Sequence, residues 1–253
     1  MKVLILAGGF GTRLSEETDI RPKPMVEIGG KPILWHIMKT YSHFGVKRFI
    51  LALGYKGEVI KDYFANLSHM KSDYTINLKS GLMTVHKEPD MDWNVTLVDT
   101  GLDTMTGGRI KRLKDYIGED DFLLTYGDGV ADIDIAATID LHNACDKLVT
   151  MTVVRPVARF GELDINDNVV ESFEEKPQLH QGWINGGFFV CRPEVINHIE
   201  GDHEMFEREP LQRIIKDNGM TAYKHEGFWQ CMDSKRDHDK LNEIWDAGLA
   251  PWA

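Results

Sequence analysis

The sequence KVLILA at residues 2–7 runs directly into GGFGTRL at residues 8–14, and this junction decides the fold. The mainly apolar run predicts a buried strand, and the glycines after it predict a tight turn. Short apolar runs then alternate with helical patterns along the chain, which is typical of α/β proteins with a parallel sheet. We therefore expect a Rossmann-like, mixed and mostly parallel central sheet flanked by helices, with β-rich insertions. The predicted strands include 2–7, 48–53, 94–99, 122–126 and 148–154, and the predicted helices are 32–44, 58–64, 108–117, 134–144, 207–217 and 235–246.

The organisation of the chain indicates one folding unit. A chain of 253 residues buries roughly 70–75% of its unfolded surface when it folds. It contains no internal repeat, low-complexity tract or obvious linker, so we expect residues 1–253 to form a single domain. Short strands are expected to dominate 163–190. The segment 66–92 is ambiguous, with a hairpin of 75–78 and 83–86 as one interpretation.

Charge and cysteine content narrow the function classes. The chain has 29 basic and 40 acidic residues, a net charge of −11. Such a surface repels phosphate backbones and anionic lipids, so we expect neither nucleic acid nor membrane partners, although a small polyanion can still bind at a local cluster of cations. Three scattered cysteines without a CxxC pair indicate inert thiols in a reducing cytoplasm. No apolar run approaches the ~20 residues of a membrane span, and the N-terminal run lacks the longer apolar core of a signal peptide.

Two segments near the N-terminus carry candidate phosphate ligands. Glycines after a strand let backbone N–H groups approach a phosphate, and Arg13 adds a cation that suits a polyphosphate. The dinucleotide pattern GxGxxG fails at Leu14, and the P-loop pattern is absent. Lys23 stands between two prolines in RPKPM (21–25), which we expect to keep the loop extended and to aim its charge. An ordinary βα turn and a solvated surface lysine are the alternative interpretations.

Two aspartates are candidate metal ligands. Asp128, within Gly-Asp-Gly, follows the predicted strand 122–126, and ligand sites in open α/β sheets lie beyond such strand ends. Mg²⁺ prefers one or two carboxylates together with substrate phosphates. Asp233 follows the aromatic run 227–230 and is the second candidate. The alternative for Asp128 is a turn aspartate, and the sequence does not show that the two carboxylates meet.

A third group suits a sugar phosphate. In FEEKP (173–177) and INGGF (184–188), Glu, Asn and exposed backbone match sugar hydroxyls, and Lys176 matches a monophosphate. A strand end with a turn is the alternative. None of the ten histidines lies in an HExxH or triad-like neighbourhood, so we assign no catalytic role to any of them.

In chain order, these segments resemble the sugar-1-phosphate nucleotidylyltransferase family, and in particular its members that use CTP and glucose 1-phosphate. The resemblance covers nearly the whole chain. It is carried by LSEET (14–18), PKPMVEIGGKPILWHIMK (22–39), GYKG (54–57), NVTLVDTG (94–101), MTGGR (105–109), TYGDGVAD (125–132), INGGFFV (184–190) and GFWQ.MD..RD (227–237).

The resemblance implies roles for individual residues. The implied nucleotide-binding residues are Leu6, Ala7, Gly8, Gly9, Gly11, Thr12, Arg13, Lys23, Thr104, Thr106, Arg109 and Asp128. The implied sugar-phosphate-binding residues are Glu175, Lys176, Asn185 and Gly186. Asp128 and Asp233 are the implied ligands of one Mg²⁺, and the implied catalytic residues are Arg13, Lys23, Asp128 and Asp233.

The resemblance also implies a reaction. CTP and α-D-glucose 1-phosphate would give CDP-glucose, for deoxysugar and surface-polysaccharide synthesis, and pyrophosphate. Family members are homo-oligomers, and 66–92 is a candidate for the subunit contact. Three alternatives remain open on the sequence: a related enzyme that uses UTP or dTTP, a nucleotide-linked dehydrogenase, and a non-catalytic binding module.

Overall fold

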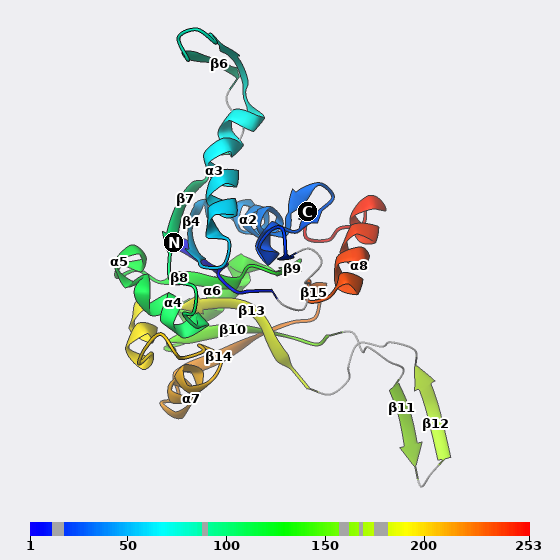
Figure 1. The fold of residues 1–253 in the computed structure, drawn as a ribbon. Coiled ribbons are helices and arrows are strands. Elements are labelled where there is room, and N and C mark those ends of the chain that lie inside the picture. The colour runs from blue at the N-terminus through cyan, green and yellow to red at the C-terminus, as the bar shows by residue number, and fades with distance from the viewer. Residues whose placement is uncertain (12–17, 88–90, 157–161, 167–168, 175–181) are drawn as a thin grey trace.

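A seven-stranded sheet forms the centre of the computed structural model, which describes residues 1–11, 18–87, 91–156, 162–166, 169–174 and 182–253. Its strands follow the order β14-β10-β13-β8-β1-β4-β7 (Figure 1). Their bounds are Lys2–Leu6 (β1), Arg48–Leu53 (β4), Asn94–Asp99 (β7), Phe122–Tyr126 (β8), Val149–Val154 (β10), Ile184–Cys191 (β13) and Met220–His225 (β14). Within this sheet β13 pairs antiparallel with both its neighbours, and the other pairs are parallel. The expected α/β fold with a mixed, mostly parallel sheet is confirmed.

The strand order reverses beside β1, and this reversal positions the site. β1 pairs with β4 on one side and with β8 on the other. The chain builds β4 and β7 outward from β1 before it returns to form β8. In open α/β sheets such a reversal leaves a crevice at the carboxyl ends of the two central strands, and ligands bind there. The glycine-rich turn after β1 and Asp128 after β8 both lie at this edge.

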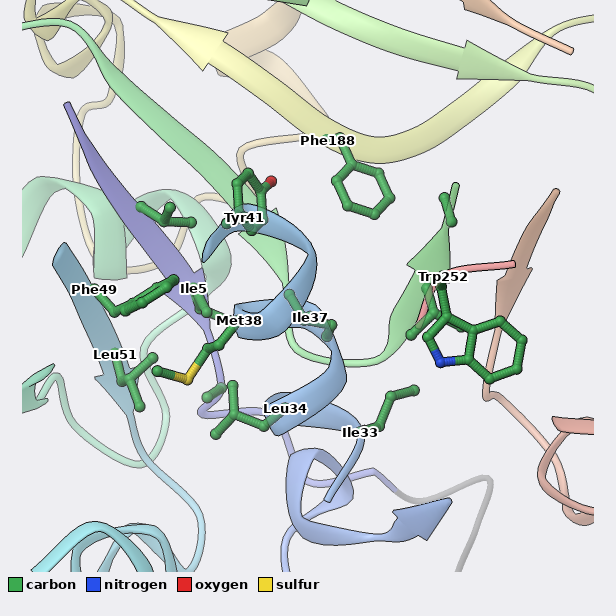
Figure 2. Close-up of a cluster of buried hydrophobic side chains, with 14 of the residues drawn as sticks. Ile5, Ile33, Leu34, Ile37, Met38, Tyr41, Phe49, Leu51, Phe188 and Trp252 are labelled. Carbon is green, nitrogen blue, oxygen red and sulfur yellow. The ribbon is translucent and has the colours of Figure 1, made fainter. Parts of the chain in front are cut away.

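Helices cover both faces of the sheet. Alternate residues of β1 face opposite sides. Val3 and Ile5 join one buried cluster with α2 (Figure 2), and Leu4 and Leu6 join the other. α2 (Ile33–His43), α3 (Gly57–Lys71) and α6 (Ile135–Ala144) lie on the first side, and α4 (Thr106–Arg112), α5 (Lys114–Ile117), the 3₁₀ helix η3 (Pro193–His198) and α7 (Glu209–Lys216) lie on the second. No helix in the described part of the chain is long and apolar enough to cross a membrane.

Four two-stranded ribbons supplement the sheet. They are β2 (Glu27–Ile28) with β3 (Lys31–Pro32), β5 (Asp73–Ile76) with β6 (Met83–Lys87), β9 (Gly129–Ala131) with β15 (Trp229–Cys231), and β11 (Glu162–Asn166) with β12 (Val169–Glu174). The β5–β6 hairpin lies at the far end of α3, and β11–β12 projects from the opposite side (Figure 1). The expected β-rich insertions and the hairpin within 66–92 are confirmed.

Two sequence expectations about single elements are wrong, and one strand was missed. α3 continues to Lys71, well beyond the expected 58–64, and the apolar residues Leu67 and Met70 after Phe64 keep the helical spacing that the expectation cut short. The helix expected at 108–117 is two helices, and the first begins at Thr106. β14 was not expected, because it is an edge strand of mixed polarity that pairs on one side with β10.

Candidate active site

A pocket of about 680 Å³ opens at the carboxyl ends of β1 and β8. It brings together the predicted site residues Leu6, Ala7, Gly8, Gly9, Gly11, Lys23, Thr104, Thr106, Arg109, Asp128, Asn185 and Asp233. Its other lining residues are Phe10, Pro24, Leu102, Asp103, Met105, Tyr126, Gly127, Trp229 and Cys231. The predicted residues Thr12, Arg13, Glu175 and Lys176 lie outside the described residues.

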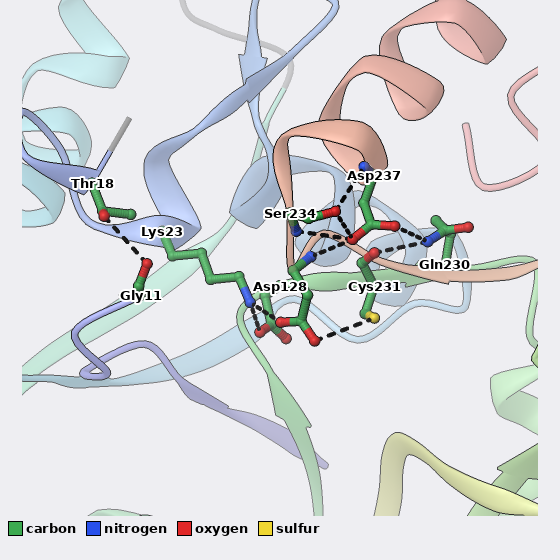
Figure 3. Close-up of polar contacts among 9 residues, drawn as sticks. Gly11, Thr18, Lys23, Asp128, Gln230, Cys231, Ser234 and Asp237 are labelled. Carbon is green, nitrogen blue, oxygen red and sulfur yellow. Dashed lines mark hydrogen bonds and ion pairs between the residues drawn. The ribbon is translucent and has the colours of Figure 1, made fainter. Parts of the chain in front are cut away.

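The glycines of the turn after β1 have different surroundings. A Cβ added to Gly8 would lie 2.3 Å from the Arg109 guanidinium, so only glycine fits there. A Cβ on Gly9 would meet nothing within 4 Å, so its backbone faces open space in the pocket wall. Gly11 has φ +65°, and its carbonyl accepts a hydrogen bond from Thr18 Oγ1 at 3.2 Å (Figure 3). The backbone of Gly9 therefore faces the pocket, and the binding of a phosphate over this turn stays a prediction.

Arg109 holds this turn in place from α4. Its Nη1 donates to Leu53 O, Thr100 Oγ1 and Gly101 O at 2.7–2.9 Å, and its Nη2 donates to Gly8 O at 3.0 Å. The side chain is only 4% exposed, and burial lowers the pKa of the guanidinium. Arg109 therefore lines the pocket with its terminal nitrogens already engaged by protein oxygens, and it supports the wall from behind.

Lys23 reaches the centre of the pocket from a short 3₁₀ turn, η2 (Lys23–Met25). The sequence expectation of an extended loop is wrong beyond Pro22. Met25 N donates to Pro22 O and Val26 N donates to Lys23 O, which closes the turn. Lys23 Nζ lies 2.6 Å from Asp128 Oδ2 and 2.5 Å from Asp233 Oδ1 (Figure 3). Burial alone would lower the Lys23 pKa, but the two ion pairs outweigh burial and raise the pKa above its usual value.

Two features bring Asp233 to Asp128. β15 pairs antiparallel with β9, and Met232 N donates to Asp128 O at 2.8 Å. α8 (Lys235–Asp246) then begins at a capping box in which the Ser234 hydroxyl and the Asp237 carboxylate bond each other's backbone N–H groups. Asp237 also accepts from Asp233 N at 3.1 Å. The two carboxylates that the sequence left unrelated therefore face each other across one ammonium group.

These two carboxylates fit a magnesium ion. They already converge on one cation, the Lys23 ammonium, at hydrogen-bonding distance. In the described part of the chain no group of three or more His, Cys, Asp and Glu side chains is placed to hold a metal. Mg²⁺ does not require one, because it takes one or two carboxylates and completes its shell with phosphates and water. Asp128 and Asp233 are the residues that would hold it.

Both threonines of the TMTGGR stretch (104–109) reach the pocket wall. Thr104 is buried. Thr106 Oγ1 donates to Glu207 Oε2 at 2.6 Å and accepts from Phe206 N at 2.8 Å. The Thr106 hydroxyl proton is therefore committed to the protein.

Several residues that line the pocket escaped the sequence analysis. Tyr126 and Trp229 line the pocket from strands that the sequence analysis used only to place Asp128 and Asp233. Trp229 Nε1 donates to Gly186 O at 2.7 Å, which places the predicted Gly186 directly behind the lining. Phe10 is 45% exposed and lies against Tyr55 with ring centroids 5.3 Å apart. An aromatic residue at a strand end was the available signal, but it is equally common in a core.

Comparison with known proteins assigns the family. Residues 2–244 match the family described as nucleotidyl transferase. The chain belongs to this family. The resemblance inferred from the sequence motifs is thereby confirmed.

Two relatives of this nucleotidyl transferase span its whole length. It is 55% identical to the glucose-1-phosphate cytidylyltransferase of Salmonella typhimurium over 253 residues, which cover 100% of this chain and 98% of the relative. It is 44% identical to a probable glucose-1-phosphate cytidylyltransferase of Bacillus subtilis, with 100% and 99% coverage.

Solved structures agree with the fold. The crystal structure of HddC from Yersinia pseudotuberculosis complexed with GMP-PN aligns with a TM-score of 0.69 at 27% identity, and covers 96% of this chain and 99% of that one. The UDP-glucose pyrophosphorylase of Acinetobacter baumannii aligns with a TM-score of 0.70, at 18% identity and with 98% and 95% coverage. The second likeness concerns the fold alone.

Proposed function

We propose that this chain is a glucose-1-phosphate cytidylyltransferase, which makes CDP-glucose and pyrophosphate from CTP and α-D-glucose 1-phosphate. The observation that carries the proposal is the full-length identity of 55% to the Salmonella typhimurium enzyme. Family membership argues against the dehydrogenase alternative. Lys23, Asp128 and Asp233 together in one pocket argue against a non-catalytic module.

In this proposal the pocket divides between two ligands. The nucleotide lies over the turn after β1, bound by Leu6, Ala7, Gly8, Gly9, Gly11, Thr12, Arg13 and Lys23, with Thr104, Thr106 and Arg109 shaping the wall and Asp128 near the phosphates. The sugar phosphate lies toward β13, bound by Glu175, Lys176, Asn185 and Gly186. Support comes from the arrangement of the described residues, since Gly9 has open space above it and Asn185 lines the pocket from β13.

The chemistry needs alignment and charge neutralisation. An oxygen of the sugar phosphate forms a bond to the α-phosphorus of CTP, and the bond from that phosphorus to the bridging oxygen breaks. Pyrophosphate leaves with the electron pair. The attacking phosphate is already ionised near pH 7, so the proposed reaction requires no general base. Lys23 neutralises phosphate charge as the two anions approach.

Asp128 and Asp233 would hold one Mg²⁺ in this reaction. When bound, the ion supplies charge neutralisation at the phosphate oxygens. The Lys23 ammonium, which lies beside both carboxylates, would face the phosphates from this position. Lys23 is well placed for this because its side chain is long and η2 fixes only its backbone.

We also propose that the chain is a single domain that works as a cytoplasmic homo-oligomer, with its product used in deoxysugar synthesis. The three cysteines are free thiols, as a reducing compartment requires. In the β5–β6 hairpin, Tyr74 pairs with Val85 and Ile76 pairs with Met83, so their side chains share one face. All four are exposed, and a hairpin with an uncovered apolar face is marginal alone. A second copy of the chain is the occupant that we propose for this face.

Product analysis tests the proposed reaction. The protein is incubated with CTP, glucose 1-phosphate and Mg²⁺, and the nucleotide products are separated and identified by mass. We expect CDP-glucose in equal amount to pyrophosphate. Pyrophosphate with CMP in place of CDP-glucose would contradict the transfer, because water would then be the acceptor.

A further inference from the structure

Glu207 lies behind the pocket and joins its two sides. The residue is half-buried and precedes α7. Its Oε2 accepts from Thr106 Oγ1 at 2.6 Å, and its Oε1 accepts from Tyr126 OH at 2.6 Å. Thr106 begins α4 beside the glycine-rich turn, and Tyr126 ends β8. One carboxylate therefore ties the start of α4 to the end of β8.

The chemistry of a carboxylate fixes the direction of these hydrogen bonds. An ionised carboxylate only accepts, so both hydroxyl groups must donate to it. Burial, followed by the nearby Glu207 charge, raises the pKa of Tyr126, so this hydroxyl keeps its proton and stays a donor. The oxygen of Tyr126 is then left with lone pairs and acts as an acceptor for its other neighbour.

That neighbour is Asn185, which lines the pocket. Asn185 Nδ2 donates to Tyr126 OH at 3.1 Å, and Asn185 Oδ1 accepts from Gly187 N at 2.8 Å. Gly187 has φ +82°, and a Cβ there would lie 2.7 Å from the Tyr126 ring, so the close packing of these residues requires glycine. The carboxamide is held at both ends, and its second N–H takes no partner among the residues that the structure describes.

We propose that Glu207 is a positioning residue that sets the orientation of the Asn185 carboxamide through Tyr126 and the position of the α4 wall through Thr106. The ligand class that Asn185 recognises is a hydroxylated sugar phosphate, and this part rests on the proposed function. In this way the N–H donor of the Asn185 carboxamide is held in its orientation before either substrate binds. Glu207 touches no substrate and acts only through the two hydroxyl groups.

Three single variants separate the two links of Glu207, one through Tyr126 to Asn185 and one to Thr106. Tyr126→Phe removes the link to Asn185 and should raise KM for glucose 1-phosphate roughly 3- to 10-fold, the effect of one ordinary hydrogen bond, with KM for CTP changed less than about 2-fold. Thr106→Val should instead raise KM for CTP roughly 3- to 10-fold and change KM for glucose 1-phosphate less than about 2-fold. Glu207→Gln replaces one of the two accepting oxygens by an NH₂ group, whereas the hydroxyl groups of Thr106 and Tyr126 each donate to a separate oxygen. This variant should therefore raise KM for CTP and KM for glucose 1-phosphate.

The double variant Glu207→Gln/Tyr126→Phe should have the same KM for glucose 1-phosphate as Tyr126→Phe alone, because both changes break the same link. Glu204→Gln is the matched control. Glu204 lies three residues earlier and is bonded to Arg213 and to Glu200 N, away from the pocket lining. We expect Glu204→Gln to lower the melting temperature and to leave both KM values unchanged. Independent, additive effects of Glu207→Gln and Tyr126→Phe would overturn the proposal.

A second measurement does not depend on the reaction. The side-chain amide protons of Asn185 are followed by NMR in the ligand-free protein. We expect faster exchange with water and a changed chemical shift in Tyr126→Phe and in Glu207→Gln, but not in Glu204→Gln. An unchanged Asn185 signal in Glu207→Gln would contradict the positioning role, even if the wild-type protein proved inactive with CTP and glucose 1-phosphate. Wild-type inactivity would instead contradict the proposed function alone.

Discussion

Lys23 and Asp128 are 105 positions apart in the sequence, yet the Lys23 ammonium lies 2.6 Å from Asp128 Oδ2. Asp233 joins the same ammonium from a third part of the chain. The two carboxylates and the lysine thus form one cluster at the reversal of the strand order. Mg²⁺ takes one or two carboxylates together with phosphates and water, so we propose Asp128 and Asp233, which converge on one cation here, as its ligands.

Replacing Asp128 tests the metal assignment. Asp128→Asn keeps the shape of the side chain and removes its charge. We expect kcat to fall roughly 100- to 1000-fold, as for other preorganised electrostatic groups, because phosphate charge is then less well neutralised. The melting temperature should stay close to that of the wild type, because the side chain is partly exposed. Activity equal to the wild type in saturating Mg²⁺ would refute the assignment.

Replacing Lys23 tests the role of the cation. Lys23→Ala should cost about 2–4 kcal/mol in kcat/KM, or roughly 30- to 1000-fold, because a buried positive charge near the reacting phosphates is lost. Lys47→Ala is the control, since it removes the same charge from an exposed pair with Asp92. A variant that loses stability but keeps the kcat/KM of its folded fraction would show that Lys23 is only structural.

Two neighbouring glycines give a matched test of the turn. Gly9→Ala adds a methyl group in open space, so folding should be unaffected, whereas KM for CTP should rise about 10-fold or more as the phosphates are pushed from the backbone. Gly8→Ala places the methyl group against Arg109 and should mainly lower the melting temperature. Steady-state kinetics and thermal unfolding of both variants separate the effects. Normal CTP affinity in Gly9→Ala would argue against a nucleotide over this turn.

We expect the apolar face of the β5–β6 hairpin to contact a second subunit. Ile76→Asp puts a charge on the apolar face and should shift the protein to monomers in light scattering coupled to gel filtration. Thr84→Asp is the control, because Thr84 pairs with Thr75 on the opposite face of the same hairpin. We expect no change of mass from this variant. The same mass for wild type and Ile76→Asp would exclude the hairpin as the subunit contact.

Buried histidines predict a loss of stability in mild acid. Burial lowers the pKa of His36, whose Nε2 bonds Ile28 O at 2.9 Å under Trp252. Below about pH 6.5 His36 binds a proton in the unfolded chain but stays neutral in the folded chain, because its pKa is lower there. The free energy of unfolding therefore falls as the pH falls. Urea unfolding followed by tryptophan fluorescence should show lower stability at pH 5.5 than at pH 7.5. His36→Gln should weaken this dependence, and an equal dependence in both proteins would contradict the explanation.

The local parts of this fold were predictable from the sequence. The strands 48–53, 94–99 and 122–126 have the predicted bounds because short apolar runs between turn signals specify buried strands. α4 begins at Thr106, two residues earlier than expected. Gly107 and Gly108 are poor helix formers, so nothing in the sequence indicated that the helix extends over them. They are glycines because they pack closely against the segment 202–206. A Cβ on Gly108 would lie 2.5 Å from Asp202 Cα, and no local pattern reports such a contact.

The long-range parts of the site were not predictable by periodicity. Glu207 stands in an unremarkable polar stretch, and its partners Tyr126 and Thr106 are 81 and 101 positions away. The meeting of Asp128 with Asp233 depends on the β9–β15 pair, whose strands have three residues each. Such short pairs give no signal of their own. The motif resemblance implied that Asp128 and Asp233 lie together but did not indicate Glu207, and the packing of the chain explains both arrangements.

The most direct test of the central claim is pyrophosphate release with glucose 1-phosphate, Mg²⁺ and each of CTP, UTP, dTTP, ATP and GTP in parallel. The proposed function predicts the highest kcat/KM with CTP, and loss of the signal when Mg²⁺ is chelated or glucose 1-phosphate is omitted. A higher kcat/KM with UTP or dTTP would contradict the cytidylyl assignment and keep the reaction class. Release without the sugar phosphate would contradict the transfer itself.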